Sequence, residues 1–446
     1  MKFTMKPILL VALVLIVSIV LAFLLLSSED SKKWAPVWKS ASSLSVNRQG
    51  LAAVEVNGFI YAMGGAMGTN FLKTTEYAKV LEDGSLGPWM PGPPMNEARG
   101  YVAAVAKDGY IYVIGGGHGE AGKVLLRTVE RSRVLPDGSL SPWEIEKNSM
   151  VFPRRCAKAV LVDDTIYAIG GFSGDMLNNV EHSRINADGT IGMWFVEPEK
   201  LTEMSYISGV KNVDGIVYVA GSHEQRAGRA TRNVEWSMVV DEAGFGKWQK
   251  TTPMQVERFG QGLIARNGRL YAIGGLNGPS FIDSIESAPI LSEGGVEQWT
   301  LSTSKLSSPR AMMAILIYKD RVYSIGGAGT NVVEYATFNE DGAIGSWLTP
   351  EELETIETAK RKQAEQASEL PNAGLVLKTM HADPYVYLQV QVGPQTVVWV
   401  AAPAGDYKAD DKIRFGGGAM MTNFFSKQLN KRFEEVFFVQ KVRKVE

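Results

Sequence analysis

Residues 51–65 read LAAVEVNGFIYAMGG, two short apolar runs joined by Asn57-Gly58 and followed by the pair Gly64-Gly65. The runs are rich in Val, Ile, Tyr and Ala and are too short for helices, so they predict two antiparallel strands. Asn-Gly favours a two-residue hairpin turn, because both residues adopt positive φ readily. The glycine pair predicts a point where the backbone lies too close to a neighbour for a Cβ atom.

This segment is the first copy of a repeat, because its landmarks recur along most of the chain. In five units a tyrosine lies three residues before a glycine pair, and in the fourth unit Tyr218 precedes Ala220-Gly221. A glutamate follows the pair by about eleven residues, and a tryptophan recurs every 48 to 54 residues. Seven tryptophans therefore bound six units. The landmarks are Tyr61, Tyr112, Tyr167, Tyr218, Tyr271 and Tyr323; Glu76, Glu130, Glu181, Glu235, Glu286 and Glu334; and Trp38, Trp89, Trp143, Trp194, Trp248, Trp299 and Trp347.

Each unit predicts four strands. In the first unit residues 75–81 form a third strand, Asp83-Gly84 forms a second turn, and Trp89 opens the fourth strand. The fourth unit is degenerate, with Ala220-Gly221 in place of the glycine pair. A four-stranded unit of about 50 residues cannot cover both of its faces, so we expect the units to stack against one another and close into a ring.

These residues resemble the kelch family, in which a Gly-Gly pair follows an apolar strand, the third strand carries Glu and the fourth carries Trp. The resemblance covers about 310 of the 446 residues and implies an all-β, six-bladed β-propeller over residues 34–348. Both Trp38 and Trp347 compete for the last fourth strand. We predict that the segment around Trp38 closes the ring, because Trp347 leads directly into helical sequence. Four turns of the form Asp-Gly-x-apolar are similar to those of bacterial members; they begin at Asp83, Asp137, Asp188 and Asp341.

The N-terminal segment predicts a membrane anchor within residues 1–33. Positions 8–26 are apolar except for Ser18, and as a helix they would measure about 28 Å, close to the hydrocarbon thickness of a bilayer. Lys2 and Lys6 precede this stretch, so we expect a single-pass protein with a cytoplasmic N-terminus and its bulk in the periplasm or outside the cell. The alternative is a cleaved signal peptide, whose apolar region is usually shorter.

The C-terminal part predicts a helical linker over residues 349–373 and a second domain over residues 374–446. Thr349-Pro350 is a helix start, with a capping hydroxyl and proline at the first helical position. Five alternating strands then suit a small OB-like barrel. We place these strands at residues 375–377, 385–392, 397–401, 412–415 and 436–442.

Residues 398–403 and 421–430, together with Phe433, resemble small bacterial envelope proteins found near nitrite-reductase and other respiratory cytochrome systems. This resemblance implies a position in the envelope and respiratory cytochrome complexes as partners. Relatives often carry histidine where Phe425 stands, which puts a metal role of this loop in doubt. Met380-His381 and Met420-Met421 are soft copper ligands in principle, although core and turn roles fit them better.

Composition excludes several functional classes. The 46 Lys and Arg residues nearly balance 48 Asp and Glu residues, and the formal charge of −2 argues against bulk binding to nucleic acid. The single cysteine, Cys156, excludes an internal disulfide and a multi-thiolate zinc site. We predict no metal site, no cofactor and no catalytic residue. Two loop histidines, His118 and His223, lie in units that are not adjacent and predict no metal centre.

The candidate ligand-binding residues are arginines that recur at the start of the inner strands. We place them around the mouth of the propeller channel, where they would bind a carboxylate, an acidic peptide or a sugar acid. The alternative is that they pair with the recurring glutamates. They are Arg48, Arg99, Arg154, Arg258 and Arg310, with Ser208 in the degenerate unit, and a separate basic loop offers Arg226, Arg229 and Arg232 as a partner-binding rim.

The sequence therefore predicts a membrane-anchored, extracytoplasmic binding or scaffold protein whose propeller face binds a protein or an acidic or glycan ligand. The alternative is a propeller enzyme that acts on a sugar acid, similar to kelch-type mutarotases. An acid such as Glu120 or Glu224 within reach of the channel would favour the enzyme. A channel lined only by arginines would favour binding.

Overall fold

The computed structural model describes residues 32–445 apart from 225–228, 241–243, 369–371 and 394–395. Two compact units divide the chain, and Trp34–Trp347 forms the larger one. The predicted anchor, residues 8–26, lies outside the described residues. Within the described part of the chain, no helix combines the length and apolar character needed to cross a membrane.

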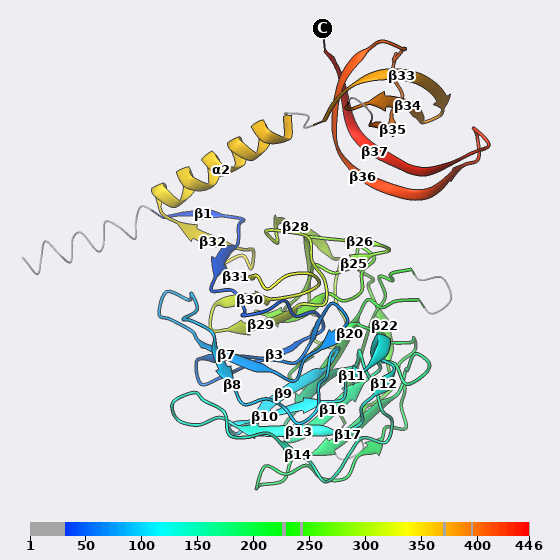
Figure 1. Cartoon of the computed structure of the whole chain (residues 1–446). Coiled ribbons are helices and arrows are strands. Elements are labelled where there is room, and N and C mark those ends of the chain that lie inside the picture. The colour runs from blue at the N-terminus through cyan, green and yellow to red at the C-terminus, as the bar shows by residue number, and fades with distance from the viewer. Residues whose placement is uncertain (1–31, 225–228, 241–243, 369–371, 394–395, 446) are drawn as a thin grey trace, which may run out of the picture. The chain divides into compact units, whose positions relative to one another are not determined.

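The larger unit is a ring of six antiparallel sheets, which we call blades one to six in chain order (Figure 1). Their innermost strands contact one another in sequence around the ring, and the last contacts the first. Blades one to three comprise β3 (Ala52–Val56), β4 (Phe59–Met63), β7 (Thr75–Lys79) and β8 (Met90–Gly92); β9 (Ala103–Lys107), β10 (Tyr110–Ile114), β13 (Val129–Arg133) and β14 (Glu144–Ile145); and β15 (Lys158–Val162), β16 (Thr165–Ile169), β17 (Val180–Arg184) and β18 (Phe195–Val196).

Blades four to six repeat this plan, so the predicted six-bladed propeller is confirmed. Blade six contains additional strands from the N-terminal segment. The three blades comprise β19 (Gly209–Val213), β20 (Ile216–Ala220), β21 (Val234–Met238) and β22 (Gln249–Thr251); β23 (Gly262–Arg266), β24 (Arg269–Ile273), β27 (Ser284–Pro289) and β28 (Thr300–Lys305); and β29 (Ala314–Tyr318), β30 (Arg321–Ile325), β31 (Val333–Phe338) and β32 (Ile344–Leu348).

The glycine pair has the role that its sequence predicts. Gly64 has φ 60°, and a Cβ atom there would lie 2.4 Å from the carbonyl oxygen of Arg99, in the link that leads to the next blade. No side chain fits in that gap. The pair therefore allows the backbone after the second strand to lie directly against the link between blades.

The N-terminal segment closes the ring at blade six. β2 (Lys39–Ala41) pairs with the first half of β31, and β32 pairs with its second half, while β1 (Lys33–Ala35) adds to the edge of β32. Trp38 is 8% exposed and packs between blades five and six, in the place that Trp299 takes between blades four and five. Trp347 is 50% exposed. The Trp38 segment therefore joins the last blade, as predicted, but it shares β31 with β32, the strand that carries Trp347.

The recurring tyrosine ties each of four blades to the next. Its hydroxyl donates a hydrogen bond to the carbonyl of the glycine in the following blade's Asp-Gly turn, as Tyr61 does to Gly138 at 2.7 Å. Gly138 has φ 85°, and a Cβ atom there would meet the Phe59 ring at 2.4 Å. The other three pairs are Tyr112 with Gly189, Tyr271 with Gly342 and Tyr323 with Gly84.

Tyr61→Phe is expected to lower the free energy of unfolding by about 1 kcal/mol, because it removes a buried hydrogen bond and leaves the Gly138 carbonyl without that donor. Tyr218 is the matched control. It is equally buried, and its hydroxyl has no partner among the described residues. Tyr218→Phe should therefore cost nothing or stabilise slightly, as measured by chemical denaturation. Equal losses in the two variants would contradict the role of the inter-blade hydrogen bond.

The smaller unit begins with the helix α2 (Pro350–Ser368), close to the predicted range. Its start is a reciprocal capping arrangement. The backbone N of Thr349 donates to Glu352 Oε2 at 2.8 Å, and the backbone N of Glu352 donates to Thr349 Oγ1 at 3.2 Å. Two N–H groups that the helix itself cannot satisfy are thereby paired.

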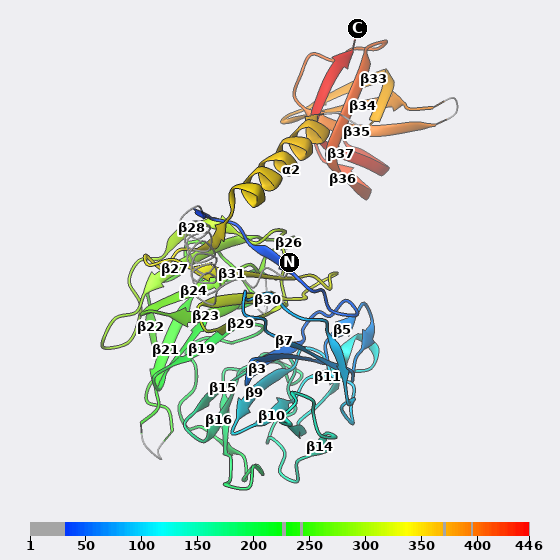
Figure 2. The same ribbon diagram turned by 90° about the vertical axis from the view of Figure 1, so that its left-hand side faces the viewer.

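Five strands then form a closed barrel in the order β33-β34-β35-β37-β36 (Figure 2). β35 and β37 are parallel, and the other neighbours are antiparallel. A core that includes Val386, Leu388 and Val400 fills the interior. The strands are β33 (Asn372–Ala382), β34 (Tyr385–Gln391), β35 (Val397–Pro403), β36 (Lys412–Ser426) and β37 (Lys431–Val445).

All five predicted barrel strands exist, but four of them, β33, β35, β36 and β37, are longer than predicted. β36 continues through residues 416–418, three glycines, and ends only at Ser426. The segment that we expected to be a loop, residues 421–430, is therefore mostly one arm of a hairpin with β37. The three glycines and the pairs Met420-Met421 and Phe424-Phe425 obscure the period-2 pattern in this segment. Its backbone hydrogen bonds come from pairing with the long β37.

Candidate functional site

The five recurring arginines lie in buried ion pairs. Each is at most 1% exposed and contacts the glutamate of its own blade's third strand. Arg99 Nη2 lies 2.7 Å from Glu130 Oε1, and Arg258 Nη2 lies 2.8 Å from Glu286 Oε1. The remaining pairs are Arg48 with Glu76, Arg154 with Glu181, and Arg310 with Glu334.

Four of these arginines also hold the glycine pair. Arg99 Nη1, for example, donates to the Gly115 carbonyl at 2.9 Å, and Arg258 Nη1 donates to the Gly274 carbonyl at 2.7 Å. Burial lowers the pKa of Arg99, while the Glu130 carboxylate opposes this shift. This geometry matches the alternative in which the arginines pair with the recurring glutamates. Ligand contact by the five arginines stays a prediction, and a ligand would reach them only by opening a buried ion pair.

In blade four the residue in the arginine position is Ser205, not Ser208 as the sequence predicted. Gly171 N donates to the Ser205 carbonyl at 2.7 Å, as Gly116 N donates to the Arg154 carbonyl at 2.8 Å. A sequence signal for this assignment exists. Every arginine follows a buried Leu or Met by four residues, and Leu201 stands four residues before Ser205.

Beside Ser205 lies a pocket of about 270 Å³, which we call the blade-four pocket. Glu235 lies at its buried floor and is 5% exposed, whereas Met204, Glu224 and Asn233 form an exposed rim. Glu235 accepts hydrogen bonds from Thr202 N at 2.7 Å and Thr202 Oγ1 at 2.8 Å. Burial raises its pKa. No motif in the sequence predicts this pocket. Its lining residues are Glu203, Met204, Ser205, Ser208, Val219, Gly221, Ser222, His223, Glu224, Thr231, Asn233 and Glu235.

A second pocket, of about 130 Å³, lies among the six innermost strands. Its described lining is mostly Ala, Val, Leu and Gly, with Lys158 and Gln261 as the polar members. Burial lowers the pKa of Lys158. This described lining contains neither an arginine nor a carboxylate. It therefore shows neither the carboxylate expected for a propeller enzyme nor the arginines expected for a ligand-binding channel.

The remaining predicted residues are dispersed. Arg229 and Arg232 are exposed, and Arg226 lies outside the described residues. Glu120 is exposed and pairs with Lys123 in blade two, whereas His223 lines the blade-four pocket. Over the part of the chain that the structure describes, no cluster of three His, Cys, Asp or Glu residues has the geometry to hold a metal ion.

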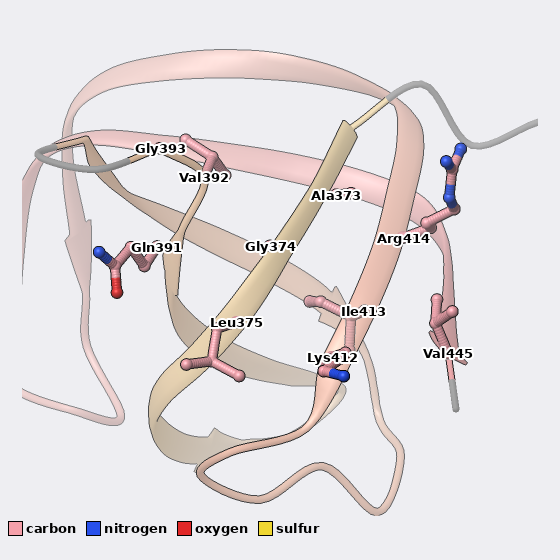
Figure 3. Close-up of a pocket in the computed structure, with 10 residues that line it drawn as sticks. All are labelled: Ala373, Gly374, Leu375, Gln391, Val392, Gly393, Lys412, Ile413, Arg414 and Val445. Atoms are coloured by element: carbon pink, nitrogen blue, oxygen red, sulfur yellow. The ribbon is translucent and has the colours of Figure 1, made fainter.

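The barrel carries a broad pocket of about 570 Å³ on its own surface. Figure 3 shows its lining, in which Lys412, Ile413 and Arg414 follow one another along β36 and Leu375 lies on β33. Ile413 is buried and belongs to the barrel core. The lining is therefore largely apolar at its base.

No family model matches the chain. Curated relatives include kelch-repeat proteins. The chain is 24% identical to "Kelch repeat protein M-T8" of Myxoma virus, over 42% of this chain and 33% of that protein. It is 22% identical to "Kelch repeat and BTB domain-containing protein 1" of Ectromelia virus, over 57% of this chain and 42% of that protein. It is 23% identical to "Beta-scruin" of Limulus polyphemus, over 33% of this chain and 16% of that protein. The chain thus spans less than half the length of these relatives.

A solved structure titled "Structure of YjhT" has the same fold, with a TM-score of 0.53 at 15% identity. The match covers 68% of this chain and 98% of the solved one. The six blades and the glycine pairs show that Trp34–Trp347 is a six-bladed β-propeller, and the similarity to kelch proteins supports a propeller of the kelch type.

Proposed function

We propose that this protein is a membrane-anchored, extracytoplasmic scaffold that binds another protein through one face of its propeller. The observation that carries this proposal is the asymmetry between the two faces. The turn between the first and second strands has two residues in every blade. The connection between the second and third strands ranges from seven residues, 326–332, to fourteen, 115–128. Loops that vary on a constant frame are the usual place for recognition.

We call this variable side the loop face; it comprises the second-to-third-strand connections and the links between blades. The two sets lie together, since the link residue Gly100 bridges Gly117 and Phe259 bridges Leu276. Val124 and Phe281 are exposed on the loop face. Apolar and aromatic side chains of this kind supply the contact area of protein interfaces. Arg229 and Arg232 add a basic rim suited to acidic groups on a protein or glycan.

Support for the envelope position comes from residues 8–26, an apolar stretch of bilayer-spanning length. Support for an OB-like assignment of the second domain comes from its strand order, with β35 parallel to β37 and β33 paired to β36. We propose respiratory cytochrome complexes as partners of this domain on the resemblance of residues 398–403 and 421–430 alone. The barrel would then add a second contact to that of the propeller.

The proposal predicts that the chain remains in the pellet of carbonate-washed membranes and that its partner is lost when the loop face is altered. Val124→Glu with Phe281→Glu places two charges on that face, in blades two and five. We expect at least a tenfold loss of the partner captured from solubilised membranes, because a desolvated charge opposes association. Quantitative mass spectrometry of the captured material measures this loss.

The matched control carries Leu135→Glu with Leu291→Glu, which alters exposed residues in the turns between third and fourth strands of the same two blades. It should retain the partner. Release of the chain by carbonate would refute the anchor. An equal loss of partner in both double variants would refute binding by the loop face.

A further inference from the structure

We propose that the blade-four pocket is a binding site for a guanidinium group supplied from outside the chain. The group would take the place that an arginine of the chain itself occupies in the other five blades. This inference goes beyond the scaffold function and does not depend on it, because it concerns one pocket and one ligand chemistry.

The other blades show what this position binds. In blade one, Arg48 donates to the Glu76 carboxylate at 2.8 Å and to the carbonyl and hydroxyl oxygens of Thr74 at 2.9 Å. Blade three has asparagine in the threonine position, and Asn179 Oδ1 accepts from Arg154 Nη2 at 3.0 Å. The guanidinium is therefore held by a glutamate and by the residue two positions before it.

Blade four keeps these acceptors and lacks the arginine. Glu235 and Asn233 correspond to Glu181 and Asn179 of blade three, at the same spacing and with Asn retained. Ser205 is too short to reach them, and its hydroxyl instead donates to Ser208 Oγ at 2.9 Å. The volume that an arginine side chain would fill is left as the pocket.

Glu235 has no cationic partner within the described residues. It is 5% exposed, lines the pocket and forms no ion pair there. The nearby Lys250 pairs with Glu203 at the rim. A buried carboxylate without a counterion is unfavourable, and desolvation indeed raises the pKa of Glu235. A cation of the right shape would relieve this cost.

The third acceptor that an arginine contacts in other blades is also present in blade four. The Gly221 carbonyl corresponds to the Gly115 and Gly274 carbonyls, because Gly221 likewise directly follows the second strand and stands three residues after the recurring tyrosine. The side-chain amide of Gln261 donates to the carbonyl of Ala220, one residue earlier. Because Gly221, Asn233 and Glu235 all line the pocket, a planar group with several N–H donors, entering from the rim, suits these acceptors better than a spherical ammonium ion.

Other ligand classes fit less well. An anion would face Glu235 at the floor and Glu203 and Glu224 at the rim, with His223 as the one lining residue able to become positive. A metal ion needs several convergent ligands. The described part of the chain offers no group of three such residues with suitable geometry.

The test is calorimetric titration of the full-length protein in detergent with methylguanidine. We expect saturable binding to the unaltered protein, at least tenfold weaker binding to Glu235→Gln, and no binding to Ser205→Arg, in which the chain's own arginine fills the pocket. Glu120→Gln removes an exposed carboxylate of blade two and is the control that should bind like the unaltered protein. Methylammonium should bind more weakly than methylguanidine.

Ser205→Arg also has a readout that needs no ligand, namely a melting temperature equal to or above that of the unaltered protein. Absence of methylguanidine binding, or binding that survives in both Ser205→Arg and Glu235→Gln, would overturn the proposal. A second titration uses a short peptide with one central arginine. Tighter binding of the peptide than of methylguanidine assigns the group to a protein partner, and weaker binding assigns it to a small molecule. Loss of the loop-face partner leaves these titrations unchanged.

Discussion

Arg99→Ala is expected to lower the free energy of unfolding by about 3 to 5 kcal/mol, the usual result of removing one partner of a buried ion pair. Arg99 and Glu130 are both fully buried. After the substitution Glu130 keeps the backbone N–H groups of Asn96 and Glu97, but its charge has lost its counterion. The Gly115 and Thr128 carbonyls lose a donor as well. Thermal unfolding of the propeller should move down by roughly 5 to 10 °C.

Two controls separate burial from charge in this experiment. Lys250→Ala removes an ion pair whose side chains are largely exposed, and it should cost less than about 1 kcal/mol. Adding Glu130→Gln to Arg99→Ala removes the stranded charge and should recover part of the loss. An unchanged melting temperature together with weaker binding of an acidic ligand would instead support the arginines as an anion-binding ring.

The strands and turns of the blades could be predicted from the sequence because each turn or strand depends on residues close to it in the chain. The turn at Asn57-Gly58 requires positive φ, and both residues have it, at 53° and 81°. Thr349 and Glu352 form the predicted helix start for the same reason. In contrast, β36 extends over residues 412–426 because it pairs with β37, and a partner strand leaves no period in the sequence itself.

The candidate sites could be predicted only in part, because burial depends on the stacking of blades. The recurrence of one Arg and one Glu in five of the six units is visible in the sequence. Whether the arginines line the mouth of a channel or form internal ion pairs depends on where the link between blades lies, and the sequence does not show this. The blade-four pocket was harder still. It arises from the absence of one side chain at Ser205, and Gln261 enters from the next blade. A degenerate repeat is thus a place to look for a site.

The second large effect is expected from the closure of the ring, where two tryptophans of the same repeat compete. Trp38→Ala should lower the free energy of unfolding by about 3 to 5 kcal/mol. Its ring fills the cluster between blades five and six that includes Tyr271 and Leu306, and the strand that follows it holds β31. Chemical denaturation of the full chain, followed by tryptophan fluorescence, measures the change.

Trp347→Ala is the matched control and should cost only about 1 kcal/mol. Its ring is half exposed and makes an edge contact with Trp34 at 5.4 Å between centroids, which is within the range of a single aromatic pair. The ratio of the two losses decides which strand seals the propeller. Because the Trp38 segment and blade six are separated by almost three hundred residues, a seal at Trp38 makes the stability of every blade depend on that long-range pairing. Similar losses in both variants, or a larger loss at Trp347, would assign the seal to β32 instead.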